Sequence, residues 1–336
     1  MPRPYKNPIF FIALGLFGVY TIEFGVVGIL PVIMERYEVT ASLAGMLVGI
    51  FALVIALLGP FMVLLLSRYN RKKILMISLF IFTASSLLSA YAPNFYVLLA
   101  LRIIPALFHP VYFSLAFVAA RSLYPAEKMS FTEQLGILRK VPLWINIGAA
   151  TFIFAAMFSV YSYSVEYLGQ EMSLTGEVIG IMLVIFGIGG VAGNLFAGNL
   201  ISRNKVKTTF FHPLALGLSY FLLIWGSSFS LPLVVIMIIW GAAHTSGLIV
   251  TQIWLTAEAT EAPGFATALY ISFINLGVTI GSATGGWFIS QVGMQGTMWS
   301  GYSFILVALV CIGLRILLCR KERRTHAKMV VQSQGK

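Results

Sequence analysis

The stretch ASLAGMLVGIFALVIALLGPFMVLLL (residues 41–66), followed at once by SRYNRKK (residues 67–73), decides the class of fold. The first 26 residues carry no charge, and a helix needs about 20 apolar residues to cross the roughly 30 Å hydrocarbon layer of a bilayer. The next seven residues include four cations, which is typical of a cytoplasmic loop. This segment therefore predicts a membrane-spanning helix that ends at the cytoplasmic surface.

The rest of the chain repeats this pattern. Of its 336 residues, 59% are hydrophobic and only 10% are charged, whereas an average soluble domain has about 25% charged residues. The apolar runs are continuous rather than alternating, which favours helices over a barrel. We therefore predict an all-α membrane protein with about ten transmembrane helices. The predicted spans are residues 8–34, 41–66, 74–91, 96–119, 143–168, 178–200, 210–229, 231–253, 265–290 and 297–319.

The distribution of cations predicts the orientation. When ten helices are threaded alternately, 20 of the 22 Lys and Arg residues fall on one side of the membrane. The exceptions are Arg36, on the opposite side, and Arg102, inside a span. This positive-inside pattern places both termini in the cytoplasm of a bacterial cell, with the chain in its inner membrane. It also explains the net charge of +11 through loops that face an anionic leaflet, so we expect no nucleic-acid partner.

An internal repeat predicts the domain organisation. A shift of 135 residues places Ser67-Arg68 on Ser202-Arg203 and His109 on His244, so that spans one to four overlay spans five to eight. The chain is then a four-helix bundle followed by a six-helix bundle. Its predicted parts are a first membrane bundle (residues 1–120), a cytoplasmic amphipathic linker with a capping-box pattern at 130–133 (residues 121–142), a second membrane bundle (residues 143–319) and a basic cytoplasmic tail (residues 320–336).

The segment GPFMVLLLSRYNRKK (residues 59–73) is similar to the signature loop of the major facilitator superfamily, which ends in D-R-x-G-R-K. Here Ser67 replaces the acidic residue and Asn70 the glycine, and the chain contains no Asp. Glu23-Phe24-Gly25 with Pro31, and residues 98–102, also resemble the drug:proton antiporter branch that contains sugar- and purine-efflux permeases. The signature-loop residues carried over are Gly59, Ser67, Arg68, Arg71 and Lys72.

The resemblance implies a two-bundle fold from which the family's fifth and sixth helices are absent. It implies a monomeric secondary transporter that moves a small molecule and protons across the lipid bilayer, without a cofactor. We expect proton-driven efflux of a sugar, a purine or a drug-like solute. Two alternatives stay open: a truncated, transport-incompetent member of the family, and a membrane-embedded enzyme, which the scarcity of intramembrane acids disfavours.

Glu23 is the first candidate for the mechanism. It lies 15 residues into its span, where an ionised carboxylate costs about 2.5–3.5 kcal/mol on insertion scales. It is either a proton-coupling site or a permanently neutral acid held by an interhelical hydrogen bond. Arg102 lies within about 7 Å of the same depth, so we expect a Glu23–Arg102 ion pair. The alternative is that Arg102 extends to the membrane interface.

Six further residues are candidates for the wall of a substrate cavity. His109 and His244 lie near the middle of repeat-related spans, and Tyr20 stands one turn from Glu23. Tyr163 and Glu166 share a helix face, and Asn275 is the main polar residue of its span. For the histidines the competing interpretation is ordinary packing, and for the tyrosines an interfacial aromatic belt. No cluster has the spacing of a metal site.

Overall fold

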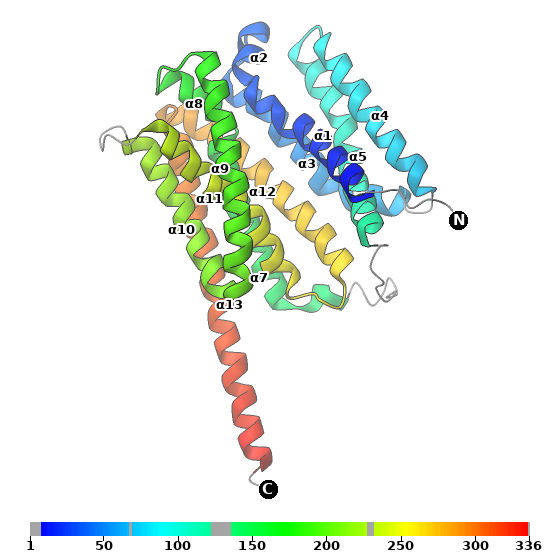
Figure 1. Ribbon diagram of the computed structural model, residues 1–336, viewed down its shortest axis with the longest axis vertical. Helices are drawn as coiled ribbons and strands as arrows, with labels where there is room; N and C mark the ends of the chain where they lie inside the picture. The colour runs from blue at the N-terminus through cyan, green and yellow to red at the C-terminus, as the bar shows by residue number, and fades with distance from the viewer. Residues whose placement is uncertain (1–7, 67–68, 122–135, 227–231, 335–336) are drawn as a thin grey trace.

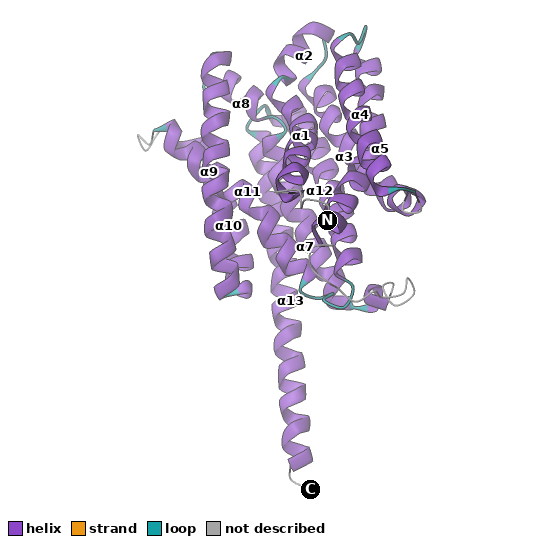
Figure 2. Ribbon diagram, turned by 45° about the vertical axis from the view of Figure 1, so that its right-hand side comes forward, coloured by secondary structure: helices purple, strands orange, loops and turns teal. Residues whose placement is uncertain are grey.

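The computed structural model describes residues 8–66, 69–121, 136–226 and 232–334, and in this part of the chain helices joined by short connections are the only secondary structure (Figures 1 and 2). Its elements are α1 (Pro8–Gly28), α2 (Leu30–Tyr37), α3 (Ala41–Leu66), α4 (Arg71–Ala90), α5 (Phe95–Arg121), the 3-10 turn η1 (Gly136–Arg139), α7 (Val141–Tyr161), α8 (Ser164–Gln170), α9 (Gly176–Arg203), α10 (Lys205–Trp225), α11 (Leu233–Thr256), α12 (Pro263–Val292) and α13 (Gly296–Gln334).

The helices confirm the predicted class and number of spans. Among the described residues, nine helices are long and apolar enough to cross a membrane, and the bent pair α1–α2 makes ten. The first predicted span is broken at Ile29, where α1 and α2 meet at 58°. Pro31 explains the break, because its ring lacks an N–H and collides with the carbonyl four residues earlier in a continuous helix.

The helix boundaries reproduce the internal repeat. A shift of 135 residues takes the first residue of α3, Ala41, onto Gly176, the first residue of α9. The same shift brings the starts of α1, α4 and α5 within three residues of the starts of α7, α10 and α11. α12 and α13 have no counterpart among the described helices of the first half. Within the described residues, the first half therefore contributes four spans and the second half six.

The extra pair α12–α13 encloses α7. At Gly277, Gly281 and Gly285 of α12 an added Cβ would collide with the backbone oxygens of three α7 residues, also four apart: Thr151, Ala155 and Ser159. Glycine at these positions lets the two helices approach at backbone distance. As a result 14 of the 21 residues of α7 are buried.

α1, the repeat counterpart of α7, is much less covered. Its large side chains Phe10, Phe11, Leu14 and Phe17 are exposed, because the described part of the first half has no helices equivalent to α12 and α13. The apolar exposure matches a lipid environment, in which an uncovered apolar face needs no protein partner.

The two ends of the bundle differ. α2 and α8 lie at one end, and α13 extends well beyond the other end in both views (Figures 1 and 2). The span within α13 ends at Cys319, but the helix continues to Gln334, so the predicted basic tail begins as a continuation of the last transmembrane helix. Residues 122–135 of the predicted amphipathic linker, including its capping box, lie outside the described residues; the described remainder starts with η1.

A small ionic cluster joins three elements at the end where α13 extends. Lys140, just before α7, contacts the carboxylate of Glu261 in the α11–α12 connection and donates to the carbonyl of Glu258 at 3.0 Å. The carboxylate of Glu258 in turn lies 2.8 Å from Nη2 of Arg315 in α13. The cluster ties the start of α7 to α13 through one connecting segment.

This cluster predicts that the free energy of unfolding decreases slightly as the pH becomes acidic. The hydrogen bond from Lys140 lowers the pKa of Glu261, so the folded protein holds this carboxylate charged to a lower pH than the unfolded chain does. The stabilisation is present above the unfolded pKa of about 4.3 and is lost as pH falls through the folded pKa. We expect Glu261→Gln to remove this component from the pH dependence of the melting temperature. The change should be small, because the side chains of Lys140 and Glu261 are both exposed and solvent weakens their interaction.

Candidate functional site

A cavity of about 260 Å³ lies where the two halves of the chain meet. α1 and α5 form its wall on the side of the first half, and α7, α9, α11 and α12 form the rest. Eight of its twenty lining residues are Phe or Tyr, and most of the lining surface is apolar. The polar and titratable side chains that the argument below uses are Tyr20, Glu23, His109, His244, Gln252 and Asn275.

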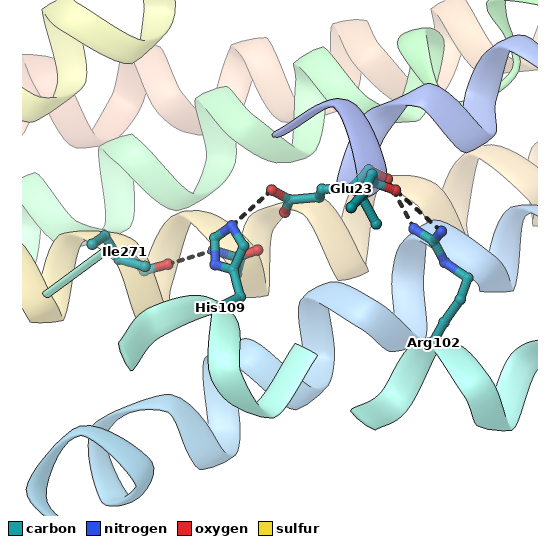
Figure 3. A network of polar contacts seen from close by, with 6 residues as sticks. Glu23, Arg102, His109 and Ile271 are labelled. Carbon is teal, nitrogen blue, oxygen red and sulfur yellow. Dashed lines mark hydrogen bonds and ion pairs between the residues drawn. The ribbon is translucent and has the colours of Figure 1, made fainter. Parts of the chain in front are cut away.

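The centre of the site is a carboxylate–imidazole pair. Oε2 of Glu23 on α1 lies 3.0 Å from Nε2 of His109 on α5, and the two residues are only 3% and 2% exposed (Figure 3). The contact has the distance of an ion pair but not the angle of a hydrogen bond, and Nδ1 of His109 has no hydrogen-bond partner among the described residues. Two titratable side chains from different helices therefore face each other on the wall of the cavity.

Aromatic rings hold His109 in place. The ring of Phe113 lies 4.7 Å from it, between centroids, and the rings of Phe51 and Tyr20 meet it edge-on at 6.0 and 6.3 Å. This enclosure excludes water from most of the imidazole and directs Nε2 toward Glu23. The low local polarity strengthens the electrostatic interaction within the pair.

The predicted Glu23–Arg102 ion pair is wrong. Arg102 is 9% exposed and donates to two carbonyls of α1, from Nη2 to Glu23 at 2.9 Å and from Nη1 to Ile22 at 3.3 Å (Figure 3). Its Nε donates to a third carbonyl, that of Leu47, at 3.1 Å. Its guanidinium carbon also lies 4.9 Å from the ring centroid of Phe51, a cation–π contact. The depth along the helix was right, but the carboxylate turns toward His109. The guanidinium also does not extend to the interface, and it instead clamps α1 to α3.

The second half places His244 of α11 on the same cavity. Its imidazole lies 4.9 Å from the ring of Tyr161 and 5.6 Å from that of Phe158, between centroids. A shift of 135 residues relates His244 to His109 and Phe158 to Glu23. The two halves therefore use the same geometry with different chemistry: carboxylate against imidazole in the first, phenyl against imidazole in the second.

Sequence reasoning missed several residues at or behind the cavity wall, of which the repeat could have found Phe158. Phe158 is the repeat counterpart of Glu23. Phe24 follows Tyr20 by one helical turn, and its ring centroid lies 5.2 Å from that of Phe158. His212 of α10 lies behind His244 with Nε2 2.9 Å from the carbonyl oxygen of Ala243, and no spacing in the sequence pointed to it. Gln252 of α11 was also missed.

The structure brings four of the six predicted cavity residues together: Tyr20, His109, His244 and Asn275 all line the cavity. Tyr163 and Glu166 do not. The hydroxyl of Tyr163 donates to the carbonyl of Ser282 at 2.7 Å, and Glu166 accepts from Gln170 at 2.7 Å in a separate groove. The structure therefore does not place these two on the predicted cavity wall: Tyr161 lines the cavity, and residues two positions apart on a helix point about 200° apart, so Tyr163 faces the opposite way.

Tyr163→Phe tests this correction. The variant loses one buried hydrogen bond, so we expect a loss of unfolding free energy of about 1 kcal/mol. Because Tyr163 does not reach the cavity, the apparent affinity for any transported solute should stay unchanged. Thermal unfolding and transport kinetics on the same preparation check both parts, and a weakened solute affinity without loss of stability would contradict the assignment.

Two described residues of the signature loop, Gly59 and Asn70, have structural roles. Gly59 of α3 lies against α5, where an added Cβ would be 2.7 Å from Cγ of Pro110. Asn70 caps α4 by accepting from the backbone N–H groups of Lys72 and Lys73, and Arg71 and Lys72 lie exposed in the first turn. Ser67 and Arg68 lie outside the described residues. The substitution of Asn70 for the glycine is thus explained as an N-cap.

Comparison with known proteins now assigns the family. A family model described as Major Facilitator Superfamily matches residues 12–132 and 147–333. The chain is 29% identical to the inner membrane transport protein YdhP of Escherichia coli K12, over 96% of this chain and 97% of that protein. It is 24% identical to a probable sugar efflux transporter of Helicobacter pylori G27, over 90% and 93% of the two chains.

The alignment with the E. coli relative also measures a difference in length. It spans 401 positions, and 96% of this 336-residue chain is about 323 residues. About 78 aligned positions of that relative therefore have no residue in this chain. Two transmembrane helices together with their connecting loops have about this many residues, which agrees with the four-plus-six organisation.

Two solved structures share the fold. A bacterial homologue of the human lysosomal transporter Spinster, in an inward-facing and unoccupied conformation, superimposes with a TM-score of 0.65 at 14% identity, over 95% of this chain and 98% of that one. The fucose:proton symporter of E. coli gives a TM-score of 0.59 at 14% identity, over 93% and 99%. Since the family model matches most of the chain, the protein belongs to the major facilitator superfamily and is a membrane transporter.

Proposed function

We propose that the protein exports a small organic solute across a bacterial inner membrane in exchange for protons. The observation that supports this most directly is the buried contact between Glu23 and His109 on the wall of a cavity shared by both halves. A carboxylate at this depth in a membrane protein is costly unless it is neutralised or functional. Here its partner is a second titratable group rather than a fixed cation.

The pair can couple a proton to a change of shape. With one proton shared between them, Glu23 and His109 are together neutral, and a second proton leaves a net positive charge inside the membrane. That charge is stabilised differently in a cavity open to water and in one closed from it, so protonation biases the equilibrium between conformations. The halves of the chain, which meet at the cavity, are the parts expected to move.

The size and lining of the cavity limit the solute. Pockets for drug-sized ligands range from about 300 to 1,000 Å³, so a cavity of about 260 Å³ favours a small molecule. Its aromatic walls suit a planar or partly apolar face, and Gln252 and Asn275 offer hydrogen bonds. A sugar, a purine or a small drug-like compound all fit this description, and the name of the H. pylori relative supports efflux.

Transport in proteoliposomes tests the proposal. Purified protein is reconstituted, and uptake of radiolabelled sugars, purines and lipophilic compounds is measured with and without an imposed pH gradient. We expect at least one compound to move faster than in protein-free vesicles, and only when the gradient is present. Flux that ignores the gradient would contradict proton coupling.

The second candidate is a transport-incompetent member of the family. The exposed flank of α1 favours it, because an incomplete first bundle leaves one side of the transport path covered by a single helix. A well-folded, monodisperse preparation that moves none of the compounds would decide for this alternative.

The proposed threading makes its own prediction. If both termini are cytoplasmic, the turn between α9 and α10 at Asn204 faces the cytoplasm and the turn between α12 and α13 at Gln295 faces outward. A single cysteine at position 204 should stay unlabelled by a membrane-impermeant maleimide in intact cells, whereas one at position 295 should be labelled. The reverse pattern would overturn the orientation.

A further inference from the structure

A groove of about 510 Å³ runs between α1–α2 and α4–α5, away from the transport cavity. Its walls include Thr21, Gly25 and Val32 on one side and Ser86 on the other. Arg102 lies at its buried side, and Arg36 and Tyr37 of α2 lie at its outer end. The groove is thus a separate space with one arginine at its buried side and a second at its outer end.

The hydroxyl groups between the two ends of this groove need no hydrogen bond from an occupant. The hydroxyl of Thr21 already donates to the carbonyl of Phe17, and those of Ser86 and Ser89 donate to the carbonyls one turn earlier, each at 2.8 Å. Between these residues the lining is aliphatic, with Val26 and Ile29 among its members. An apolar chain can lie here without leaving a buried hydrogen-bonding group unsatisfied.

The internal repeat shows what fills the equivalent space in the second half. α7 and α10 are the counterparts of α1 and α4, and α13 packs against both of them. Tyr302 of α13 donates to the carbonyl of Gly217 on α10 at 3.1 Å, and Cys311 of α13 lies against Gly148 of α7. Among the described residues of the first half no helix takes this position, so the groove is the volume that a transmembrane helix occupies in the other half.

The guanidinium of Arg36, at the outer end of the groove, has one long hydrogen bond and no ion pair among the described residues. Its Nη1 lies 3.5 Å from the carbonyl of Ala90, at the limit of a hydrogen bond, and its guanidinium lies 5.3 Å from the ring of Tyr37. No ion pair of the described residues includes it, and its exposed neighbours Glu35 and Glu38 do not line the groove.

The level of Arg36 is that of the lipid headgroups. Tyr37 lies beside it, and Tyr91 and Tyr96 at the α4–α5 connection are strongly exposed. Tyrosines at this position are typical of a membrane interface, where the apolar ring meets the hydrocarbon and the hydroxyl meets water. A guanidinium here is within reach of phosphate oxygens, which it binds through paired N–H donors.

We propose that this groove binds a phospholipid of the surrounding bilayer, with its phosphate paired to Arg36 and an acyl chain lying against the exposed face of α1. The lipid fills the volume that α13 fills between α7 and α10. It seals the flank of α1 against water and completes the first bundle. The proposal does not depend on the proposed transport function.

Native mass spectrometry of the full chain, purified in mild detergent, tests the proposal. An added Cβ at Gly25 would meet only Cγ2 of Thr21, at an ordinary contact distance of 3.9 Å, so Gly25→Trp can place its ring in the groove. Gly187→Trp on the exposed face of α9 is the matched control. We expect wild type and the control to retain one phospholipid that Gly25→Trp lacks. In titrations with phosphatidylglycerol, Arg36→Gln should bind about fivefold more weakly, whereas Arg203→Gln, which removes an exposed cation elsewhere, should not.

Three results would overturn the proposal. The first is equal lipid retention by wild type, Gly25→Trp and Arg36→Gln. The second is displacement of the lipid by inorganic phosphate alone, which would mean that Arg36 holds a free anion and the groove contributes nothing. The third is a dimer of wild type that dissociates in Gly25→Trp, which would mean that a second copy of the chain fills the groove.

Discussion

Glu23→Gln is expected to reduce solute flux driven by a pH gradient to the level of protein-free vesicles. The glutamine keeps the size of the side chain and still reaches His109, which lies 3.0 Å from the carboxylate, but it cannot bind or release a proton. The coupled step is therefore lost while the cavity keeps its shape. Exchange of solute at equal concentrations without a gradient should persist, because binding and the change of shape do not require the proton.

A matched control separates this effect from the removal of any buried acid. Glu166 is also buried within a spanning segment but lies in a separate groove, hydrogen-bonded to Gln170. Glu166→Gln should leave gradient-driven flux unchanged. Gradient-driven transport by Glu23→Gln at the wild-type rate would remove the proton role of this residue and would leave the family assignment standing.

His109→Asn extends the same argument to the other member of the pair. Asparagine keeps a polar amide near the position of Nδ1, ends short of the Nε2 that contacts Glu23, and offers no second titratable group, so the site can no longer take up a net positive charge. We expect flux to survive in part and to lose its dependence on the size of the gradient. This pattern differs from that of Glu23→Gln, so the two variants report separate roles.

Arg102→Leu is expected to have the largest effect on stability. The guanidinium donates to carbonyls of both α1 and α3, and hydrogen bonds to a charged group contribute about 1.5–3 kcal/mol each. Those carbonyls keep their helical bonds, so we expect a net loss of about 3 kcal/mol. The loss should concentrate in α1, which few other residues hold, as faster hydrogen exchange over residues 14–28.

Two controls sharpen this test. Arg102→Lys keeps the charge but cannot reach three carbonyls at once, so its stability should fall between those of wild type and Arg102→Leu. Arg203→Leu removes an exposed arginine and should stay within about 0.5 kcal/mol of wild type. Unchanged hydrogen exchange in α1 of Arg102→Leu would show that the clamp is not what holds this helix.

The choice of partner for Glu23 shows where prediction from sequence stopped. The number of residues from the start of a helix gives depth, and by depth alone Arg102 was a reasonable partner. Successive residues of a helix differ by about 100° in direction, and this rotation is set by how the helix packs. In a soluble protein a polar face would indicate the rotation. α1 is apolar on all sides, because one side faces lipid and the other faces protein.

Tyr161 and Tyr163 make the same point over two residues. Both belong to one predicted span, and the sequence favoured Tyr163 because it shares a helical face with Glu166. Tyr163 instead donates to Ser282, and Tyr161, about 200° away around the helix, lines the cavity. No proline marks this interruption, whereas Pro31 marks the corresponding break in the first span.

The sequence by itself determined the class of fold, the number of spans, the repeat and the presence of a carboxylate deep in the first span. These follow from rules that act along the chain: backbone groups in lipid must be hydrogen-bonded within each helix, and a span must match the thickness of the bilayer. Tertiary structure alone decided that His109 is the partner of Glu23, that Arg102 binds carbonyls, and that a groove remains beside α1. Each of these depends on how helices are rotated against one another, which is fixed by contacts between residues far apart in the chain.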